Sequence, residues 1–378
     1  MQFVDLKTQY EKLKVDIDEG IRKVLHHGKF IMGPEVAELE EKLADYVGVK
    51  HCISVSSGTD ALLIPLMAWG VGPGDAVFVP DFTFVSTSEV ACLTGATPVF
   101  VDIDRKTFNM DPQSLEKMIL KVQKMGLLVP KAVIPVDLFG LPANYEQITQ
   151  IAQKYGLKVL EDAAQGFGGE IHGKKAGSFG DAAATSFFPS KPLGCYGDGG
   201  AIFTSDDALA EVMKSIRSHG QGRDKYDNVR IGLNARLDTL QAAILLVKMK
   251  AFEETELEAR NRCAHMYTDG LSGYVTTPEV PEGYASSWAQ YSLLAESHEQ
   301  RELLQRKLAE NHVPTMVYYA KPLHRQTVNR QYTFSGDDYP AADDISERIF
   351  SIPMHPYLST ENIHHIIAII QENTGKLV

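Results

Sequence analysis

The chain has 378 residues, which is long enough for two domains or for one large α/β domain with a smaller companion. Its 37 lysine and arginine residues against 49 aspartate and glutamate residues give a net charge of −12, which argues against nucleic acid or an anionic membrane as the main partner. The four cysteines form no Cys-x-x-Cys pair, so we expect a reducing compartment and neither a zinc site nor a disulfide framework. Because no segment resembles a signal peptide or approaches a membrane span, the sequence predicts a cytoplasmic protein.

Short β-rich segments alternate with longer helical patterns between residues 52 and 204. Most of the β-rich segments are apolar throughout, which is typical of strands covered on both faces. The alternation predicts an α/β protein with a mainly parallel sheet and helices on both sides. The expected strands are 52–55, 76–79, 98–101, 132–136, 157–161, 184–188 and 201–204, and the expected helices include 58–70, 86–95, 112–124 and 144–155.

A long helical pattern at about 236–270 precedes a change in composition. Short β-type segments and the helical segment 299–312 then predict a smaller α+β unit at the C-terminal end. We therefore expect a large domain over residues 1–250 and a small domain over residues 251–378.

Ligands of open parallel sheets bind at the carboxyl ends of the strands, so the residues that follow the strands are the candidate site. The first expected strand is followed by "SSGTDAL", a turn of small residues that leads into a helix. The amides of Gly58, Thr59 and Asp60 at this helix start could bind a phosphate, although an ordinary helix cap explains the same residues. The sequence contains neither a P-loop motif nor a glycine-rich dinucleotide fingerprint after a strand.

Asp162 and Gln165 follow a second strand in "EDAAQGFGG". A carboxylate among alanines and glycines is expensive to bury without a partner. Asp162 could therefore meet a buried cation such as a protonated ring nitrogen, with Gln165 reaching the same ligand, or it could simply cap a helix or turn.

Lys191 follows a third strand in "SFFPSKPLGCYGDGG". A lone lysine is usually a solvated loop residue. In an apolar site lined by glycine, however, its amine can be partly neutral and can form a Schiff base with a carbonyl group. A phosphate turn, an acid for a pyridinium nitrogen and an amine for an aldehyde are together the contacts that pyridoxal phosphate requires.

These motifs resemble the nucleotide-sugar aminotransferases of the DegT/StrS family, which have the aspartate-aminotransferase fold (fold type I of the pyridoxal-phosphate enzymes). The resemblance covers nearly the whole chain. It is carried by "GKFIMGPEVAELE", "SSGTDAL", "DFTFVST", "EDAAQ", "FFPSKPLGCYGDGGAIFT", "NARLDTLQAAIL" and "SIPMHPYLS".

The resemblance implies a role for each matching residue toward pyridoxal 5'-phosphate. Lys191 would bond covalently to the cofactor and move the proton during catalysis, and Asp162 would keep the ring nitrogen protonated. Gln165 would contact the ring hydroxyl. The phosphate would be held by Gly58, Thr59 and Ser186, joined by Asn234 of the partner subunit.

The same resemblance implies contacts with the ring face and the substrate. Phe84 would stack on the cofactor ring, with Phe82 as an alternative and core packing open for both. Arg236 would approach the substrate across a dimer interface, or would form an ion pair at a helix start. Tyr318 and Tyr319 would line the substrate site, or would pack within the small domain.

The resemblance further implies that a homodimer with shared active sites transfers the amino group of L-glutamate to a UDP-2-acetamido-2-deoxy-3-oxo-hexose for lipopolysaccharide or O-antigen synthesis. Related glucuronate enzymes tend to have a His-Tyr pair where this chain has Tyr318 and Tyr319, so the sugar could carry either a carboxylate or a hydroxymethyl group at C6. The alternatives are a 4-keto-sugar aminotransferase, a pyridoxal-phosphate-dependent sugar dehydratase and a binding protein without catalysis. Dehydratases of the family have His in place of the lysine, so Lys191 favours amino transfer.

Overall fold

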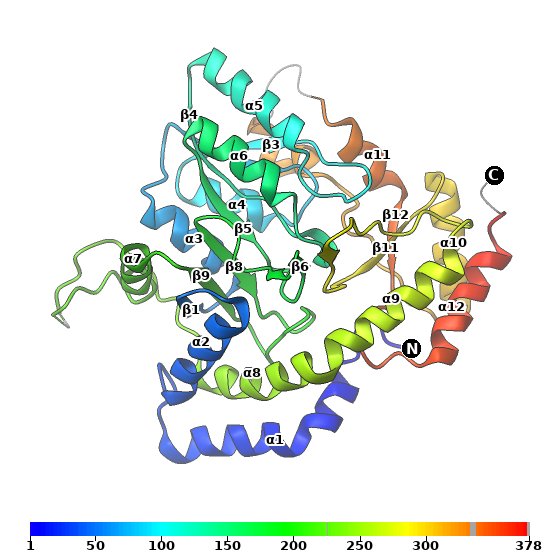
Figure 1. Ribbon diagram of the computed structural model, residues 1–378, viewed down its shortest axis with the longest axis horizontal. Coiled ribbons are helices and arrows are strands. Elements are labelled where there is room, and N and C mark those ends of the chain that lie inside the picture. Colours follow the sequence, from blue (N-terminus) through cyan, green and yellow to red (C-terminus); the bar gives the residue numbers. More distant parts are fainter. Residues whose placement is uncertain (225, 333–337, 376–378) are drawn as a thin grey trace.

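The computed structural model describes residues 1–224, 226–332 and 338–375. Its centre is a seven-stranded sheet (Figure 1), in which β9 is antiparallel to both of its neighbours and the other strands all run in one direction. The prediction of a mainly parallel sheet is therefore confirmed. The strands, in their order across the sheet, are β1 (His51–Val55), β9 (Gly200–Thr204), β8 (Ala182–Ser186), β5 (Lys158–Asp162), β4 (Val129–Val133), β2 (Asp75–Pro80) and β3 (Thr97–Val101).

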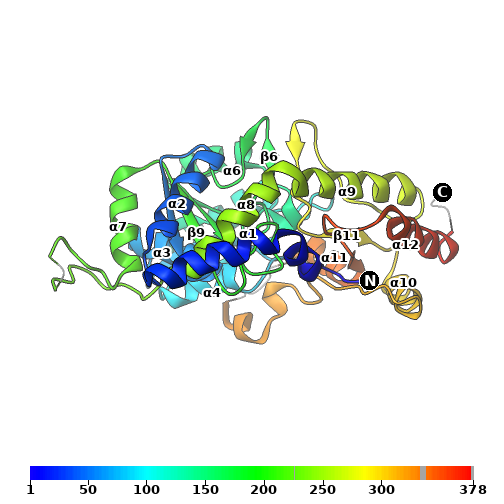
Figure 2. The same cartoon turned by 90° about the horizontal axis from the view of Figure 1, so that it is seen from below.

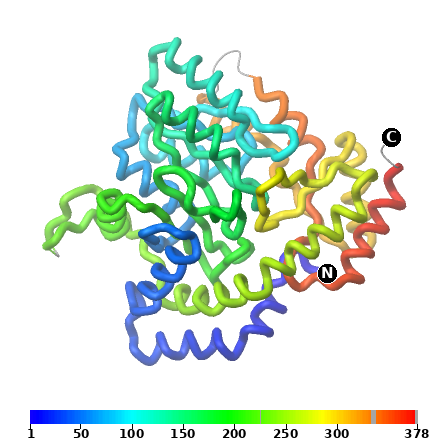
Figure 3. The backbone as a smooth tube through the Cα atoms, viewed as in Figure 1, coloured from blue at the N-terminus to red at the C-terminus, as the bar shows by residue number. Residues whose placement is uncertain are grey.

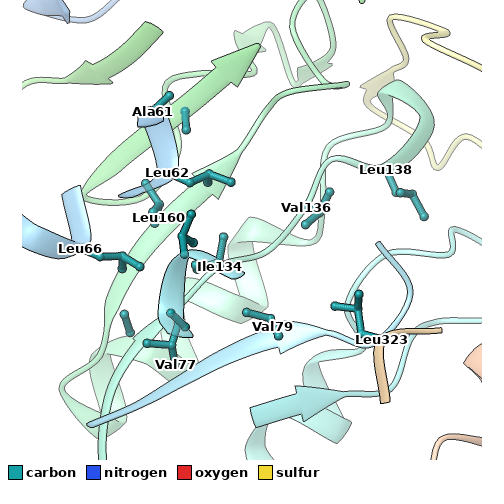
Figure 4. Close-up of a cluster of buried hydrophobic side chains, with 14 of the residues drawn as sticks. Ala61, Leu62, Leu66, Val77, Val79, Ile134, Val136, Leu138, Leu160 and Leu323 are labelled. Carbon is teal, nitrogen blue, oxygen red and sulfur yellow. The ribbon is translucent and has the colours of Figure 1, made fainter. Parts of the chain in front are cut away.

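Both faces of the sheet are covered by helices, which explains why its strands are apolar throughout. Val77 and Val79 of β2 point into one hydrophobic cluster with Leu62 of α3 (Figure 4), whereas Phe78 points into a cluster on the opposite face with Leu115 of α5. Successive side chains of a strand alternate between faces, so two apolar faces require a continuous apolar run. The helices on the first face include α3 (Gly58–Ala68), α4 (Ser86–Leu93) and α7 (Asp207–Arg217), and those on the second face include α5 (Pro112–Met125) and α6 (Tyr145–Tyr155).

Two N-terminal helices, which are not among the predicted elements, lie along the end of the sheet that carries β1. The tube in Figure 3 shows α1 (Leu6–His27) running beside α8 (Thr239–Ala251), and α2 (Pro34–Val47) packs against both α8 and β1. Gly33 precedes α2, and a Cβ at this position would lie 2.7 Å from Cγ2 of Thr239. This close approach ties the start of α2 to the start of α8.

A long helical rod leads from the sheet into the C-terminal part of the chain (Figure 2). α8 continues through a π-helical turn, Phe252–Glu256, into α9 (Leu257–Leu271). α9 packs in a separate hydrophobic cluster with the short antiparallel pair β11 (Tyr291–Leu294) and β12 (Ile349–Ile352), and with α10 (His298–Glu310) and α12 (Thr360–Glu372). α11 (Pro340–Arg348) precedes β12. The division of the chain near residue 250 stays a prediction.

Two strands end earlier than their apolar segments predict. β4 covers Val129–Val133, but Ile134 and Val136 beyond it are also buried, and Val136 still forms an isolated parallel bridge with Asp162 of β5. β8 likewise ends at Ser186, and Phe187 is buried beyond it. Burial determines which residues are apolar, so each apolar segment extends beyond the last residue of its strand. Within the described part of the chain, no helix is long and apolar enough to cross a membrane.

Candidate active site

The predicted site residues gather at the edge of the sheet where the parallel strands end. Asp162 is the last residue of β5, and Ser186 is the last residue of β8. Lys191 follows β8 by five residues, and Gly58 begins α3 directly after β1. Because β1, β8 and β5 run in the same direction, their carboxyl ends meet at this edge.

Asp162 is buried and accepts two hydrogen bonds. Its Oδ2 accepts from the hydroxyl of Thr87 at 3.1 Å, and its Oδ1 accepts from the backbone N–H of Ala164 at 3.2 Å. Burial raises the pKa of this carboxyl above its ordinary value, while these hydrogen bonds and the charge of Lys191 oppose the shift. A cation placed against Asp162 would therefore favour its ionised form.

Lys191 lies in a turn in which its backbone N–H donates to the carbonyl of Phe188 at 2.9 Å. The charge of its side chain interacts with that of Asp162. Burial lowers the pKa of the lysine ammonium below its ordinary value, and the carboxylate of Asp162 opposes that shift. A lowered pKa makes the neutral amine, which is the nucleophilic and basic form, easier to reach.

The start of α3 forms a cradle for an anion. Ser57 caps the helix by accepting from the N–H of Asp60 at 3.1 Å. Gly58 lies so close to Ser186 that a Cβ at position 58 would be 2.7 Å from the Cβ of Ser186. The hydroxyl of Thr59 meets the hydroxyl of Ser86 at 3.0 Å, so hydroxyls and helix amides converge here.

Gln165 and Tyr319 are joined by a hydrogen bond. Gln165 Nε2 donates to the hydroxyl of Tyr319 at 3.1 Å, while its Oε1 accepts from the N–H of Phe139 at 2.7 Å. Tyr319 also contacts the ring of Tyr318, with the ring centres 5.8 Å apart. The predicted contact of Gln165 with the ring hydroxyl of the cofactor stays a prediction.

The structure distinguishes the two phenylalanines that follow β2. Phe82 is fully buried within the hydrophobic core, whereas Phe84 is 55% exposed. Both rings approach Tyr319, at centre distances of 6.0 Å and 6.4 Å. Phe82 therefore packs in the core, and Phe84 is the phenylalanine that remains accessible to a ligand.

Asn234 and Arg236 line a cavity of about 560 Å³, together with Ser56 and Ser57. Arg236 Nε donates to Asn234 Oδ1 at 3.1 Å, and among the described residues it forms no salt bridge with a carboxylate. The ion pair considered for Arg236 is therefore not formed among the residues that the structure describes. The contact expected from Asn234 of the partner subunit stays a prediction.

Several residues that shape the site are not among those predicted. Thr87 binds Asp162 and Ser86 meets Thr59, and both lie in the hydroxyl-rich segment "TFVSTSE" at the start of α4, a pattern that could have indicated them. His324, by contrast, hydrogen-bonds the buried Asp81 through its Nδ1 at 2.6 Å. These two residues are 243 positions apart, and no local pattern links them.

The arrangement fits pyridoxal phosphate. The cradle at Gly58 and Ser186 admits a phosphate because no side chain at residue 58 fills it. A cation next to the buried carboxyl of Asp162 would stabilise its ionised form. Lys191 supplies an amine whose pKa is lowered, so the three groups together match the contacts that pyridoxal phosphate requires. An α/β sheet with these three groups at its carboxyl edge defines the class of lysine-dependent pyridoxal-phosphate enzymes.

Comparison with known proteins identifies the family. The model of the DegT/DnrJ/EryC1/StrS aminotransferase family matches residues 11–371. Over 369 residues the chain is 48% identical to a UDP-2-acetamido-2-deoxy-3-oxo-D-glucuronate aminotransferase of Pseudomonas aeruginosa, which covers 97% of this chain and 99% of that protein. Over 370 residues it is 38% identical to a UDP-N-acetyl-3-dehydro-alpha-D-glucosamine 3-aminotransferase of Acidithiobacillus ferrooxidans, and this match covers 97% of this chain and 96% of that protein.

A solved structure agrees with these relatives. The crystal structure of a DegT DnrJ EryC1 StrS aminotransferase from Brucella abortus has a TM-score of 0.97 and 50% identity, and the match covers 100% of both chains. The chain therefore belongs to the DegT/DnrJ/EryC1/StrS aminotransferase family. It is an aminotransferase that uses pyridoxal phosphate, and the predictions of family, fold type and cofactor are confirmed.

Proposed function

We propose that this enzyme moves the amino group of L-glutamate to C3 of a UDP-2-acetamido-2-deoxy-3-oxo-hexose. The observation that carries the proposal is the 48% identity, over nearly the full length of both chains, to an aminotransferase of the corresponding 3-oxo-glucuronate. A second relative, at 38% identity, acts on a 3-dehydro sugar of the glucosamine series, so the two named substrates share a keto group at C3. A product of this kind would serve lipopolysaccharide or O-antigen synthesis in the cytoplasm.

The roles of the protein groups follow from their charges. When bound, pyridoxal phosphate supplies the aldehyde that accepts the amino group and a ring that stabilises negative charge on the reacting carbon. Asp162, as a carboxylate, holds the proton on the ring nitrogen. The neutral amine of Lys191 would move the proton from Cα of the amino donor to the cofactor and, in the second half of the transfer, from the cofactor to C3 of the sugar. Gly58, Thr59 and Ser186 would hold the phosphate, and Phe84 would pack against the ring.

The group at C6 of the sugar separates the two substrate forms. Tyr318, which stands where related glucuronate enzymes tend to have histidine, offers a neutral hydroxyl beside Tyr319 and the ring of Phe3, whose centre is 6.3 Å away. A hydroxyl donates one hydrogen bond but supplies no positive charge for a carboxylate. The proposal therefore includes both the glucuronate and the glucose form of the 3-oxo sugar.

Mass spectrometry of products from a panel of UDP- and dTDP-linked 3-keto and 4-keto sugars tests the substrate, with glutamate as the donor. We expect a mass change that corresponds to replacement of the keto oxygen by an amino group only for a 3-keto UDP sugar. Amination of 4-keto sugars alone would replace the proposal by the 4-keto alternative.

The half-reaction with glutamate separates amino transfer from dehydration. Glutamate alone should abolish the visible absorbance of the aldehyde form of the cofactor and release 2-oxoglutarate in an amount equal to the enzyme sites. A dehydratase would eliminate water from the sugar without consuming glutamate. A protein that never acquires visible absorbance, and does not differ from its Lys191→Ala variant, would be a binding protein.

We further propose a homodimer with shared active sites, in which the accessible side chains of Asn234 and Arg236 would reach the site of the partner subunit. Mixing a Lys191→Ala variant with an Asn234→Ala variant tests this arrangement, since a mixed dimer contains one site with both native residues. We expect recovery of up to about a quarter of the wild-type activity, because half of the dimers carry one intact site of two. No recovery, together with a monomer in ultracentrifugation, would refute the dimer.

A further inference from the structure

Asp137 and Glu161 form a buried carboxyl pair next to the site. Asp137 follows β4 and Glu161 lies in β5, and both side chains are completely buried. Among the described residues no Lys, Arg or His forms a salt bridge with either carboxyl. Two unpaired carboxylates at this depth would be strongly unfavourable, so the pair must reduce its charge in another way.

The hydrogen bonds to Asp137 occupy only one of its oxygens. Oδ1 accepts from the backbone N–H of Ala143 at 3.0 Å and from the hydroxyl of Tyr145 at 2.8 Å. None of the described residues donates a hydrogen bond to Oδ2. Backbone hydrogen bonds place Asp137 directly beside the end of β5, since the N–H of Asp162 donates to the carbonyl of Pro135 at 2.9 Å and the N–H of Asp137 donates to the carbonyl of Asp162 at 3.0 Å. The carboxyls of Asp137 and Glu161 influence each other's pKa directly.

The oxygens of Glu161 both accept from backbone N–H groups. Oε1 accepts from Gly177 at 2.6 Å, and Oε2 accepts from Phe179 at 2.7 Å. A carboxylate holds two acceptor sites on each oxygen, so Glu161 can accept a further hydrogen bond but has no hydrogen to give. A hydrogen bond between the two side chains therefore requires a proton on one of them, and Asp137 Oδ2 is the oxygen without another partner.

We propose that Asp137 and Glu161 share one proton, held on Oδ2 of Asp137 and donated to the carboxylate of Glu161, and that this pair positions the loop that carries Asp162 and Gln165. Glu161 is then an anion held by three donors, and Asp137 is neutral. The pair acts through the backbone and does not touch the cofactor. Both are positioning residues.

The connection to the loop is direct. The backbone N–H of Asp137 donates to the carbonyl of Asp162 at 3.0 Å. A Cβ at Gly166 would lie 2.4 Å from Asp137 Oδ2, so this oxygen is packed against the same loop. Two residues after Asp137, the N–H of Phe139 donates to Gln165 Oε1 at 2.7 Å. A shift of Asp137 would therefore move both residues that are expected to bind the cofactor ring.

The shared proton also limits the negative charge around Asp162. Among the described residues, the other titratable groups that interact most strongly with the charge of the pair are Asp162, Tyr145 and Tyr284, and none of these three is cationic. Burial raises the pKa values of Asp137 and Glu161 alike, so the proton is retained where an exposed carboxyl would lose it. Asp162 can then ionise beside one anion rather than two.

Matched amide substitutions test the proposal. In Asp137→Asn, the amide N–H replaces the proposed proton and the amide oxygen keeps the bonds from Ala143 and Tyr145. In Glu161→Gln, the amide nitrogen cannot accept, so it would face the N–H of either Gly177 or Phe179. We expect Asp137→Asn to unfold within about 1–2 °C of the wild-type holoenzyme, and Glu161→Gln to unfold about 2–8 °C lower.

Infrared spectroscopy supplies a readout that a purely structural role would not change. At mildly acidic pH the wild-type protein should show the carbonyl band of a buried protonated carboxylic acid, and Asp137→Asn should lack this band. Persistence of the band in Asp137→Asn would overturn the assignment of the proton, as would a Glu161→Gln variant as stable as the wild type. An Asp137→Asn variant destabilised as much as Glu161→Gln would overturn it too. None of these outcomes depends on the sugar substrate.

Discussion

Gly58 at the start of α3 packs against the side chain of Ser186 at the end of β8, and a Cβ at residue 58 would lie 2.7 Å from the Cβ of Ser186. Gly58 is the first residue of the helix that follows β1, and Ser186 is the last residue of β8. Their approach closes the anion cradle between two parallel strands, and it makes the absence of a side chain at residue 58 a condition for the site.

Substitution of Gly58 by alanine should weaken cofactor binding. The added methyl group would force α3 and Ser186 apart, and such overpacking costs about 1–3 kcal/mol, which corresponds to about a 5- to 150-fold higher dissociation constant. Titration of the apoprotein with pyridoxal phosphate measures the change. Gly72→Ala is the matched control, because its nearest neighbour would be 3.7 Å from the new methyl group. Equal affinity of the two variants would contradict the cradle.

Replacing Asp162 by asparagine should lower the pKa of Lys191 further. Burial already lowers this pKa, and the carboxylate of Asp162 is the group that opposes the shift. In the apoprotein, trapping of Lys191 with a small aldehyde and borohydride, followed by peptide mapping, should therefore reach half of its maximum at a lower pH in Asp162→Asn. Thr87→Val, which removes a hydrogen bond to Asp162 but keeps the charge, should shift this midpoint less. An unchanged midpoint in Asp162→Asn would show that the two groups are not coupled.

The contact between His324 and Asp81 should make stability depend on pH. Burial tends to lower the pKa of His324, but its hydrogen bond to Asp81 and the charges of Asp81 and Asp343 outweigh burial and raise it above 6.5. The stabilisation is therefore fully present below about pH 6.5 and is lost as the pH rises through the raised folded-state value. We expect the free energy of unfolding to exceed that of His324→Asn by about 1–3 kcal/mol at pH 6, and by less at pH 9.

Urea unfolding of both proteins between pH 6 and pH 9 measures this difference. Asparagine retains a neutral donor toward Asp81, so the comparison isolates the contribution of the charge. A difference that stays constant across this range would assign the effect to packing instead.

The pair of Asp137 and Glu161 should produce a slope of the same sign at lower pH, because here too the folded state retains a proton. Burial raises the pKa of Asp137 to about 7 from its ordinary value of 3.8. Between these values the folded protein holds a proton that the unfolded chain has released, so the free energy of unfolding falls as the pH rises, by up to about 1.4 kcal/mol per pH unit for one proton. Asp137→Asn should flatten this part of the profile. The same slope in both proteins, measured by urea unfolding from pH 4 to pH 7, would argue against a proton at Asp137.

Much of the large sheet and most of the cofactor site follow from local patterns. Segments such as 76–79 are apolar on both faces because each face packs against helices, and this is visible without knowing the partners. Asp162 and Lys191 stand out because polar residues directly after such segments fall at the carboxyl edge of a parallel sheet. Phe84 and Phe82, in contrast, look alike in sequence, and only burial separates the accessible ring from the core ring.

By itself, the sequence determined the strand and helix alternation, the order of the phosphate turn, the acid and the lysine, and hence the family and its cofactor. Hydrophobic periodicity and each short motif depend on residues that are neighbours in the chain, so they can be recognised without knowledge of the fold. Only the tertiary structure decided that β9 runs against its neighbours, that Asp137 meets Glu161, and that His324 meets Asp81. These contacts join segments far apart in the chain, and their geometry depends on how whole elements pack.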